Sequence, residues 1–203
     1  MQGGGPFMGA LLLVLAPLRV INESALAIGR AIGIVAVAAM VIAILVQVFF
    51  RYVLNNALPW PDEAARFCML WMTGLMAPTA FRRGGFVAID TLVILLPKLL
   101  GSLLALFLLF VSLAVLVVAV QIGWSEVTGF AGRFATASLY LPTDMSFESW
   151  FRVPRSWMMA SLVVGLIMLI SVNVELILRA IVKLLGGADR LPVIPHDEKV
   201  GAE

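Results

Sequence analysis

The stretch that decides the fold is AIGIVAVAAMVIAILVQVFF, residues 31–50, in which no side chain carries a charge. A helix of this length rises about 30 Å, which is the thickness of the hydrocarbon core of a bilayer. Three further stretches are comparably long and apolar: 63–81, 99–123 and 156–178. None of the four alternates apolar and polar residues as the strands of a membrane barrel do. The sequence therefore predicts an all-α integral membrane protein with four transmembrane helices.

The composition of the whole chain excludes a water-soluble fold. Hydrophobic residues make up 62% of the 203 residues and charged residues 13%, about half the charged share of an ordinary soluble domain. The net charge is only +2 and the charges cluster between the apolar stretches, so nucleic-acid binding is not expected. With one cysteine, Cys68, and one histidine, His196, a single chain cannot form a disulfide or a Cys/His metal site.

Basic residues near the ends of the four stretches predict the orientation, because cytoplasmic loops carry an excess of Lys and Arg. Nine of these residues fall on one side: Arg19, Arg30, Arg82, Arg83, Lys98, Arg179, Lys183, Arg190 and Lys199. Five fall on the other: Arg51, Arg66, Arg133, Arg152 and Arg155. We therefore expect a multi-pass protein with both termini in the cytoplasm. Four of the five tryptophans fall at the outer ends, where aromatic rings settle among headgroups.

The chain divides into three parts on this interpretation. Residues 1–24 form an N-terminal interfacial or docking segment, and the alternative is a fifth span at 7–16. Residues 25–183 form the four-helix membrane domain, and 184–203 form a polar cytoplasmic tail. The long link between the third and fourth stretches shows no clear periodicity, and loops of this kind often meet another protein.

The second stretch opens with the candidate contact site. Pro61 stands near the first helical position and two carboxylates, Asp62 and Glu63, stand in the first turn, which is a strong signal for a helix start. At their spacings both carboxylates can reach the guanidinium of Arg66 on one helix face. Two interpretations stay open: a capping cluster that satisfies itself, or a polar anchor that holds a partner subunit or a binding protein. Arg51, at the end of the first stretch, either reaches lipid phosphates or pairs with a partner carboxylate.

The link between the second and third stretches is expected to meet lipid. It begins with Arg82, Arg83, Gly84 and Gly85. The two arginines are expected to fix topology and bind anionic headgroups, with a specific lipid or subunit contact as the alternative, and the glycines allow a sharp turn. The apolar run 86–96 is too short to cross the bilayer and is predicted to lie in the plane of the interface as an amphipathic segment. Its carboxylate, Asp90, is expected to pair with Arg82 or Arg83.

Two pairs of residues in the fourth stretch or directly at its end are interpreted as structural. Ser161 and Gly165 form a small-xxx-small pattern that permits close approach of another helix. Glu175 and Arg179 have the spacing of an ion pair on one helix face. The four stretches hold few ionisable residues and show no internal repeat, whereas a transport pathway usually needs one of these features.

Several runs together indicate a family. They are Arg51-Tyr52-Val53-Leu54-Asn55, Trp60-Pro61-Asp62-Glu63-Ala64-Ala65-Arg66, Trp71, Arg82-Arg83-Gly84-Gly85 and Ile89-Asp90. In order and spacing they resemble the small membrane subunit of tripartite ATP-independent periplasmic (TRAP) transporters, the DctQ type. The resemblance covers about residues 25–181, with weaker matches at Thr136, Ser138, Pro142 and Val153-Pro154. Phe86 stands where the family usually has a histidine and Ala88 where a basic or polar residue is common, so no role is carried over for that histidine.

The resemblance implies a division of labour between a periplasmic binding protein and two subunits in a bacterial inner membrane. A periplasmic binding protein delivers a solute, usually an organic acid, to this subunit and a large multi-span permease subunit. The large subunit would hold the substrate and sodium sites and move like an elevator, so this chain would need no cofactor. This chain would be a non-catalytic brace in lipid, with Arg51, Trp60, Asp62, Glu63 and Arg66 toward the partners.

Two other classes of function stay open at this point. A structural or assembly subunit of an unrelated membrane enzyme complex would share the four helices but would not need the Trp60-Pro61-Asp62-Glu63 opening. A stand-alone membrane enzyme would need a nucleophile and base, a metal-ligand set or a redox pair, and none converges in this sequence.

Overall fold

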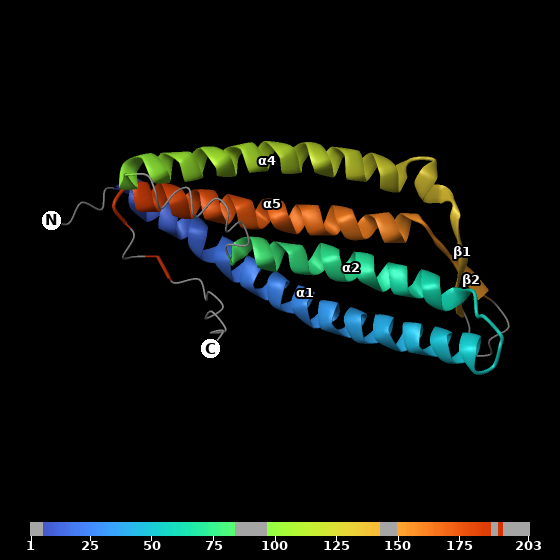
Figure 1. Ribbon diagram of the computed structural model, residues 1–203. Helices are drawn as coiled ribbons and strands as arrows, with labels where there is room; N and C mark the ends of the chain where they lie inside the picture. The colour runs from blue at the N-terminus through green and yellow to red at the C-terminus, as the bar shows by residue number, and fades with distance from the viewer. Residues whose placement is uncertain (1–5, 84–96, 143–149, 188–190, 193–203) are drawn as a thin grey trace, which may run out of the picture. The chain divides into compact units, whose positions relative to one another are not determined.

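The computed structural model describes residues 6–83, 97–142, 150–187 and 191–192. These residues contain four long helices and one two-stranded sheet (Figure 1). The helices are α1 (Pro6–Tyr52), α2 (Trp60–Arg82), α4 (Lys98–Thr128) and α5 (Ser156–Leu184). The strands are β1 (Ala135–Pro142) and β2 (Trp150–Pro154), and a 3-10 turn, Ala131–Arg133, precedes β1. All four predicted stretches are therefore helical.

Three of the helices are long and apolar enough to cross a membrane: Leu11–Tyr52, Leu99–Thr128 and Ser156–Leu184. α2 is not among them: its 23 residues are less apolar than those of the other three helices and include four charged side chains. Its position confirms the predicted helix at 63–81, while its crossing of the membrane stays a prediction.

α1 is one continuous helix of 47 residues, longer than the predicted span. It would rise about 70 Å at 1.5 Å per residue. Pro17 lies inside it and removes one backbone hydrogen bond without ending it. The boundary predicted between residues 24 and 25 falls within this helix, because the sequence between Pro17 and that point contains no second helix-breaking residue. The interfacial position of residues 1–24 stays a prediction.

The chain forms two compact units. The first contains Met1–Ala27, Ala77–Val118 and Ile167–Glu203, and the second contains Ile28–Met76 and Ala119–Leu166. α5 contributes most to the interior, since 44% of its most apolar window is buried, against 17% for α1 and none for α4. α5 is therefore the most buried of the three candidate spans.

In the second unit, small residues bring α2 and α5 into backbone contact. A Cβ atom on Gly165 would lie 2.5 Å from the carbonyl oxygen of Gly74, and a Cβ on Gly74 would meet the backbone of Ser161. The close approach predicted from Ser161 and Gly165 is confirmed, and its partner is α2. On another side of α5, a Cβ on Gly123 of α4 would lie 3.1 Å from Val163.

The strands β1 and β2 pair as an antiparallel sheet that the sequence analysis did not predict. The register pairs Ala135 with Pro154 and Tyr140 with Arg152, and an irregularity lies between the two pairs. There the hydroxyl of Thr136 donates to the carbonyl of Val153 at 2.7 Å, which ties the two strands together within the irregular region. We call this sheet the hairpin.

Some predicted features fall outside the described residues. These are Gly84, Gly85, Asp90, the amphipathic in-plane segment at 86–96 and most of the polar tail. Their predicted roles stay predictions.

Candidate functional site

The first candidate site joins the start of α2 to the hairpin through Glu63. Its carboxylate accepts hydrogen bonds from the backbone N–H groups of Ala137 and Ser138, at 2.9 and 2.5 Å. The hydroxyl of Ser138 lies 2.7 Å from the same carboxylate and 2.8 Å from the carbonyl oxygen of Pro59. Hydrogen bonds to an ionised acceptor are about twice as strong as neutral ones. Glu63 therefore holds the hairpin against the first turn of α2. We call the hydrogen bonds from Ala137 and Ser138 to the Glu63 carboxylate the Glu63 clamp.

Arg66 does not form the ion pairs with Asp62 and Glu63 that its spacing predicted. Within the part of the chain that is described, no salt bridge joins Arg66 to Asp62 or Glu63. The three side chains instead line one cleft of about 650 Å³, together with residues of α4, α5 and β1. The carboxylate of Glu63 is satisfied by the hairpin, so a self-contained capping cluster is not formed.

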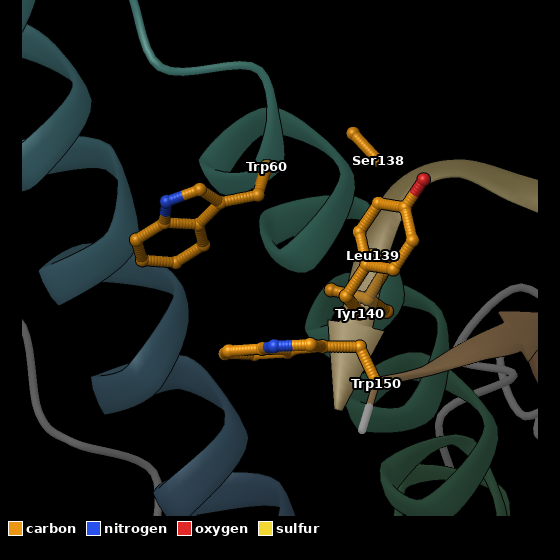
Figure 2. A pocket seen from close by; sticks show the side chains of 5 residues that line it. All are labelled: Trp60, Ser138, Leu139, Tyr140 and Trp150. Carbon is orange, nitrogen blue, oxygen red and sulfur yellow. The ribbon is translucent and has the colours of Figure 1, made fainter. Parts of the chain in front are cut away.

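An aromatic pocket of about 490 Å³ lies beside this clamp. It is lined by Trp60 at the start of α2, by Trp150 of β2 and by Ser138, Leu139 and Tyr140 of β1. Figure 2 shows the two indole rings and the tyrosine ring around a common space. All three rings are substantially exposed. An exposed aromatic pocket offers large apolar contact area with polar N–H and O–H groups at its edge.

Two arginines of the second unit lie near exposed aromatic rings. The guanidinium carbon of Arg152 lies 5.3 Å from the ring centroid of Tyr140, and Arg152 also donates to the carbonyl of Ala137 at 2.6 Å. Arg51, in the last turn of α1, lies 5.9 Å from the ring centroid of Tyr52. Of the contact residues predicted from sequence, Trp60 and Glu63 thus face the hairpin. Among the described residues, Arg51 contacts only the ring of its neighbour Tyr52.

A second site, in the first unit, is a buried ionic cluster centred on Glu175 of α5. Its side chain is 0% exposed, and its Oε1 lies 2.7 Å from Nη2 of Arg82 on α2 and 3.0 Å from Nη2 of Arg179. Its Oε2 accepts a hydrogen bond from Asn22 of α1 at 2.8 Å. The hydroxyl of Ser171 donates to Oδ1 of Asn22 at 2.6 Å. We call these side chains the Glu175 cluster; it ties three helices together.

The position of Arg82 corrects the role predicted for it. Sequence reasoning assigned Arg82 to lipid headgroups, but its side chain is only 7% exposed and is paired with Glu175. Glu23, which pairs with Arg19 at 2.8 Å, lies 3.5 Å from the same guanidinium. A carboxylate inside an apolar helix attracts a nearby arginine more strongly than headgroups in water do. Arg83, the next residue, is half-buried.

The Glu175 cluster was only partly foreseen. The pair between Glu175 and Arg179 is confirmed at 3.0 Å. The contacts with Asn22 and Arg82 were missed, because they join residues 153 and 93 positions apart. The available signal was the position of Glu175 within a long apolar stretch, where an ionisable side chain needs a partner.

The comparison with known protein families gives a match over most of the chain. The family described as tripartite ATP-independent periplasmic transporters, DctQ component, matches residues 40–183. This range covers well over half of the chain and includes the Glu63 clamp, the hairpin, Arg82 and Glu175. None of the curated proteins matches the chain. The chain therefore belongs to the DctQ family and is a small membrane subunit of a TRAP transporter.

Proposed function

We propose that this subunit is a static, non-catalytic brace that holds the large permease subunit during binding-protein-dependent uptake driven by an ion gradient. The observation that carries the proposal is the Glu175 cluster. A pathway for ions or solutes needs ionisable groups that face a cavity. Here Glu175 is enclosed by two arginines and an asparagine, which supports a structural role.

The surfaces of α1 and α4 support contact with the large subunit. α1 exposes Ile34, Val35 and Ile42, and α4 exposes Phe107 and Phe110. Such faces must be covered by lipid tails or by another membrane protein. We assign one of them to the large permease subunit, in which the sodium and organic acid sites are expected.

The hairpin supports contact with the periplasmic binding protein. The excess of basic residues on one side favours a cytoplasmic position for both termini, and the hairpin would then lie on the periplasmic side of the inner membrane. The aromatic pocket of Trp60, Tyr140 and Trp150 then faces the binding protein, while Arg51 pairs with a carboxylate of the large subunit. On this topology α2 is the fourth membrane crossing.

Co-purification followed by reconstitution tests the proposal. We expect the chain to purify from mild detergent in a fixed ratio with a large multi-span protein. In liposomes, the pair should accumulate an organic acid only when both the binding protein and an ion gradient are present. Isolation of the chain alone, or uptake by the large subunit without it at the full rate, would contradict the bracing role.

A further inference from the structure

The cleft that contains Asp62 and Arg66 has a polar end and an apolar end. Asp62 and Arg66 lie in the first two turns of α2, and Arg155 directly precedes α5. Leu70 follows Arg66 by four residues, about 6 Å along the helix, and Leu162 follows Arg155 by seven, about 10 Å. The leucines are 40% and 56% exposed. The cleft is therefore amphiphilic, with charged side chains at one end, which we call its mouth, and exposed leucines at the other.

The packing of α2 and α5 explains where the cleft ends. The helices meet at Gly74 and Ser161, where a Cβ on the glycine would meet the serine backbone. Ser161 also lines the cleft, and Leu70 lies one turn from Gly74. Toward the hairpin, the space between the helices is left open for an occupant.

The charges at the mouth are balanced. Glu63 is engaged by the hairpin, which leaves two carboxylates, Asp62 and Glu126, and two guanidiniums, Arg66 and Arg155. Across the described ranges, none of these four side chains forms a salt bridge. A zwitterionic group satisfies both signs, whereas an anionic group would meet the carboxylates as like charges.

The position of the mouth matches the level of lipid headgroups. Glu126 lies two residues before the end of the candidate span Leu99–Thr128, and Arg155 lies one residue before the candidate span Ser156–Leu184. Both residues therefore stand at the end of a candidate span, where the helix would leave the hydrocarbon. The apolar end of the cleft points along the spans, toward the acyl chains.

We propose that this cleft binds one zwitterionic phospholipid with a primary ammonium headgroup. Its phosphate accepts hydrogen bonds from Arg66 and Arg155, its ammonium lies near Asp62 and Glu126, and an acyl chain runs along Leu70 and Leu162. The bound lipid fills the space between α2, α4 and α5 and supports the base of the hairpin. This site is additional to the bracing role and does not depend on the solute.

Native mass spectrometry of the intact transporter complex tests the site. The complex is stripped of lipid in detergent and then offered phosphatidylethanolamine and phosphatidylglycerol at equal concentration. We expect retention of phosphatidylethanolamine in preference to phosphatidylglycerol. The double variant Arg66→Gln/Arg155→Gln should lose about tenfold in retention for each guanidinium, since one charge-assisted hydrogen bond contributes about 1.5 kcal/mol.

Two further variants separate lipid binding from folding. Leu162→Trp leaves all four charges in place and narrows the apolar end, so it should also lose the lipid. Arg133→Gln removes an exposed arginine outside the cleft and should retain it.

Three outcomes would overturn the proposal. The first is equal retention of phosphatidylglycerol, which would show an anion site. The second is equal retention of phosphatidylethanolamine by the double variant and by Arg133→Gln, which would show that the lipid binds elsewhere on the complex. The third is crosslinking of Arg66 to a partner protein in the lipid-loaded complex, which would show a protein contact. Each experiment measures bound lipid or a protein contact directly. A negative result for the lipid site can therefore be told apart from a loss of uptake.

Discussion

Replacing Glu175 by glutamine tests the Glu175 cluster, because it removes the charge that Arg82 and Arg179 share. Both guanidiniums are 7% exposed, so neither regains full hydration when the carboxylate is neutralised. Breaking a buried ion pair by removing one partner costs about 3–5 kcal/mol. Arg82 still has the carboxylate of Glu23 as a partner at 3.5 Å. We therefore expect a loss at the lower end of this range, about 3 kcal/mol in the free energy of unfolding.

The assay is reversible unfolding of the purified subunit in mixed micelles, followed by tryptophan fluorescence. Glu23→Gln is the matched control, since the Glu23 side chain is 42% exposed and its pairs with Arg19 and Arg82 should contribute about 1 kcal/mol or less. The triple variant Glu175→Leu/Arg82→Met/Arg179→Met should recover most of the loss, because apolar side chains of similar volume leave no buried charge. A Glu175→Gln protein within 1 kcal/mol of the wild type would refute the reasoning.

Three further predictions concern the second unit. Glu63→Gln should raise hydrogen exchange at the hairpin amides by about tenfold and lower uptake, because the charge-assisted bonds are lost, while Asp62→Asn should leave this exchange unchanged. Trp150→Ala should reduce uptake at low concentrations of binding protein and spare it at saturation; a loss only at saturation would contradict docking at the aromatic pocket. Gly165→Val should destabilise the fold by more than about 2 kcal/mol in thermal unfolding, since the new side chain meets the backbone of α2, whereas Gly9→Ala meets nothing within 4 Å and should be tolerated. A Gly165→Val protein as stable as the wild type would contradict the close packing.

Sequence patterns were sufficient for features whose causes are local. Long apolar runs predicted four helices, since a helix satisfies all its backbone groups in lipid. The proline and carboxylates near Trp60 marked the start of α2 within a few residues. The small residues Ser161 and Gly165 marked the close helix contact, and Glu175 with Arg179 marked an ion pair.

Features that depend on distant partners were not predictable. The spacing predicted a contact between Glu63 and Arg66. The hydrogen-bond partners of Glu63 are instead Ala137 and Ser138, which lie 74 and 75 residues away in the sequence. Arg82 was placed at the headgroups because nothing local reveals that Glu175 reaches it. The hairpin was missed because β1 begins with small residues and is irregular, which leaves no clear two-residue period.

A bracing subunit benefits from a buried ionic cluster. Helices in lipid lack a strong hydrophobic force to fix their relative register. The contacts of Glu175 with Asn22 and Arg82 are satisfied in only one register of α1, α2 and α5. The cluster therefore selects one packing of the first unit and resists sliding of its helices.

The most direct test of a static brace is a distance measured inside the subunit while the complex transports. Spin labels at Val53 and Phe130, two exposed positions of the second unit, are introduced after replacing the single cysteine, Cys68, by alanine. Pulsed electron paramagnetic resonance is recorded in liposomes with and without sodium, binding protein and solute. A static brace predicts one unchanged distance distribution in every condition, alongside shifts in a control pair on the large subunit. A distribution that shifts or splits with sodium or solute would show that this subunit moves with the transport cycle, and it would contradict the bracing role.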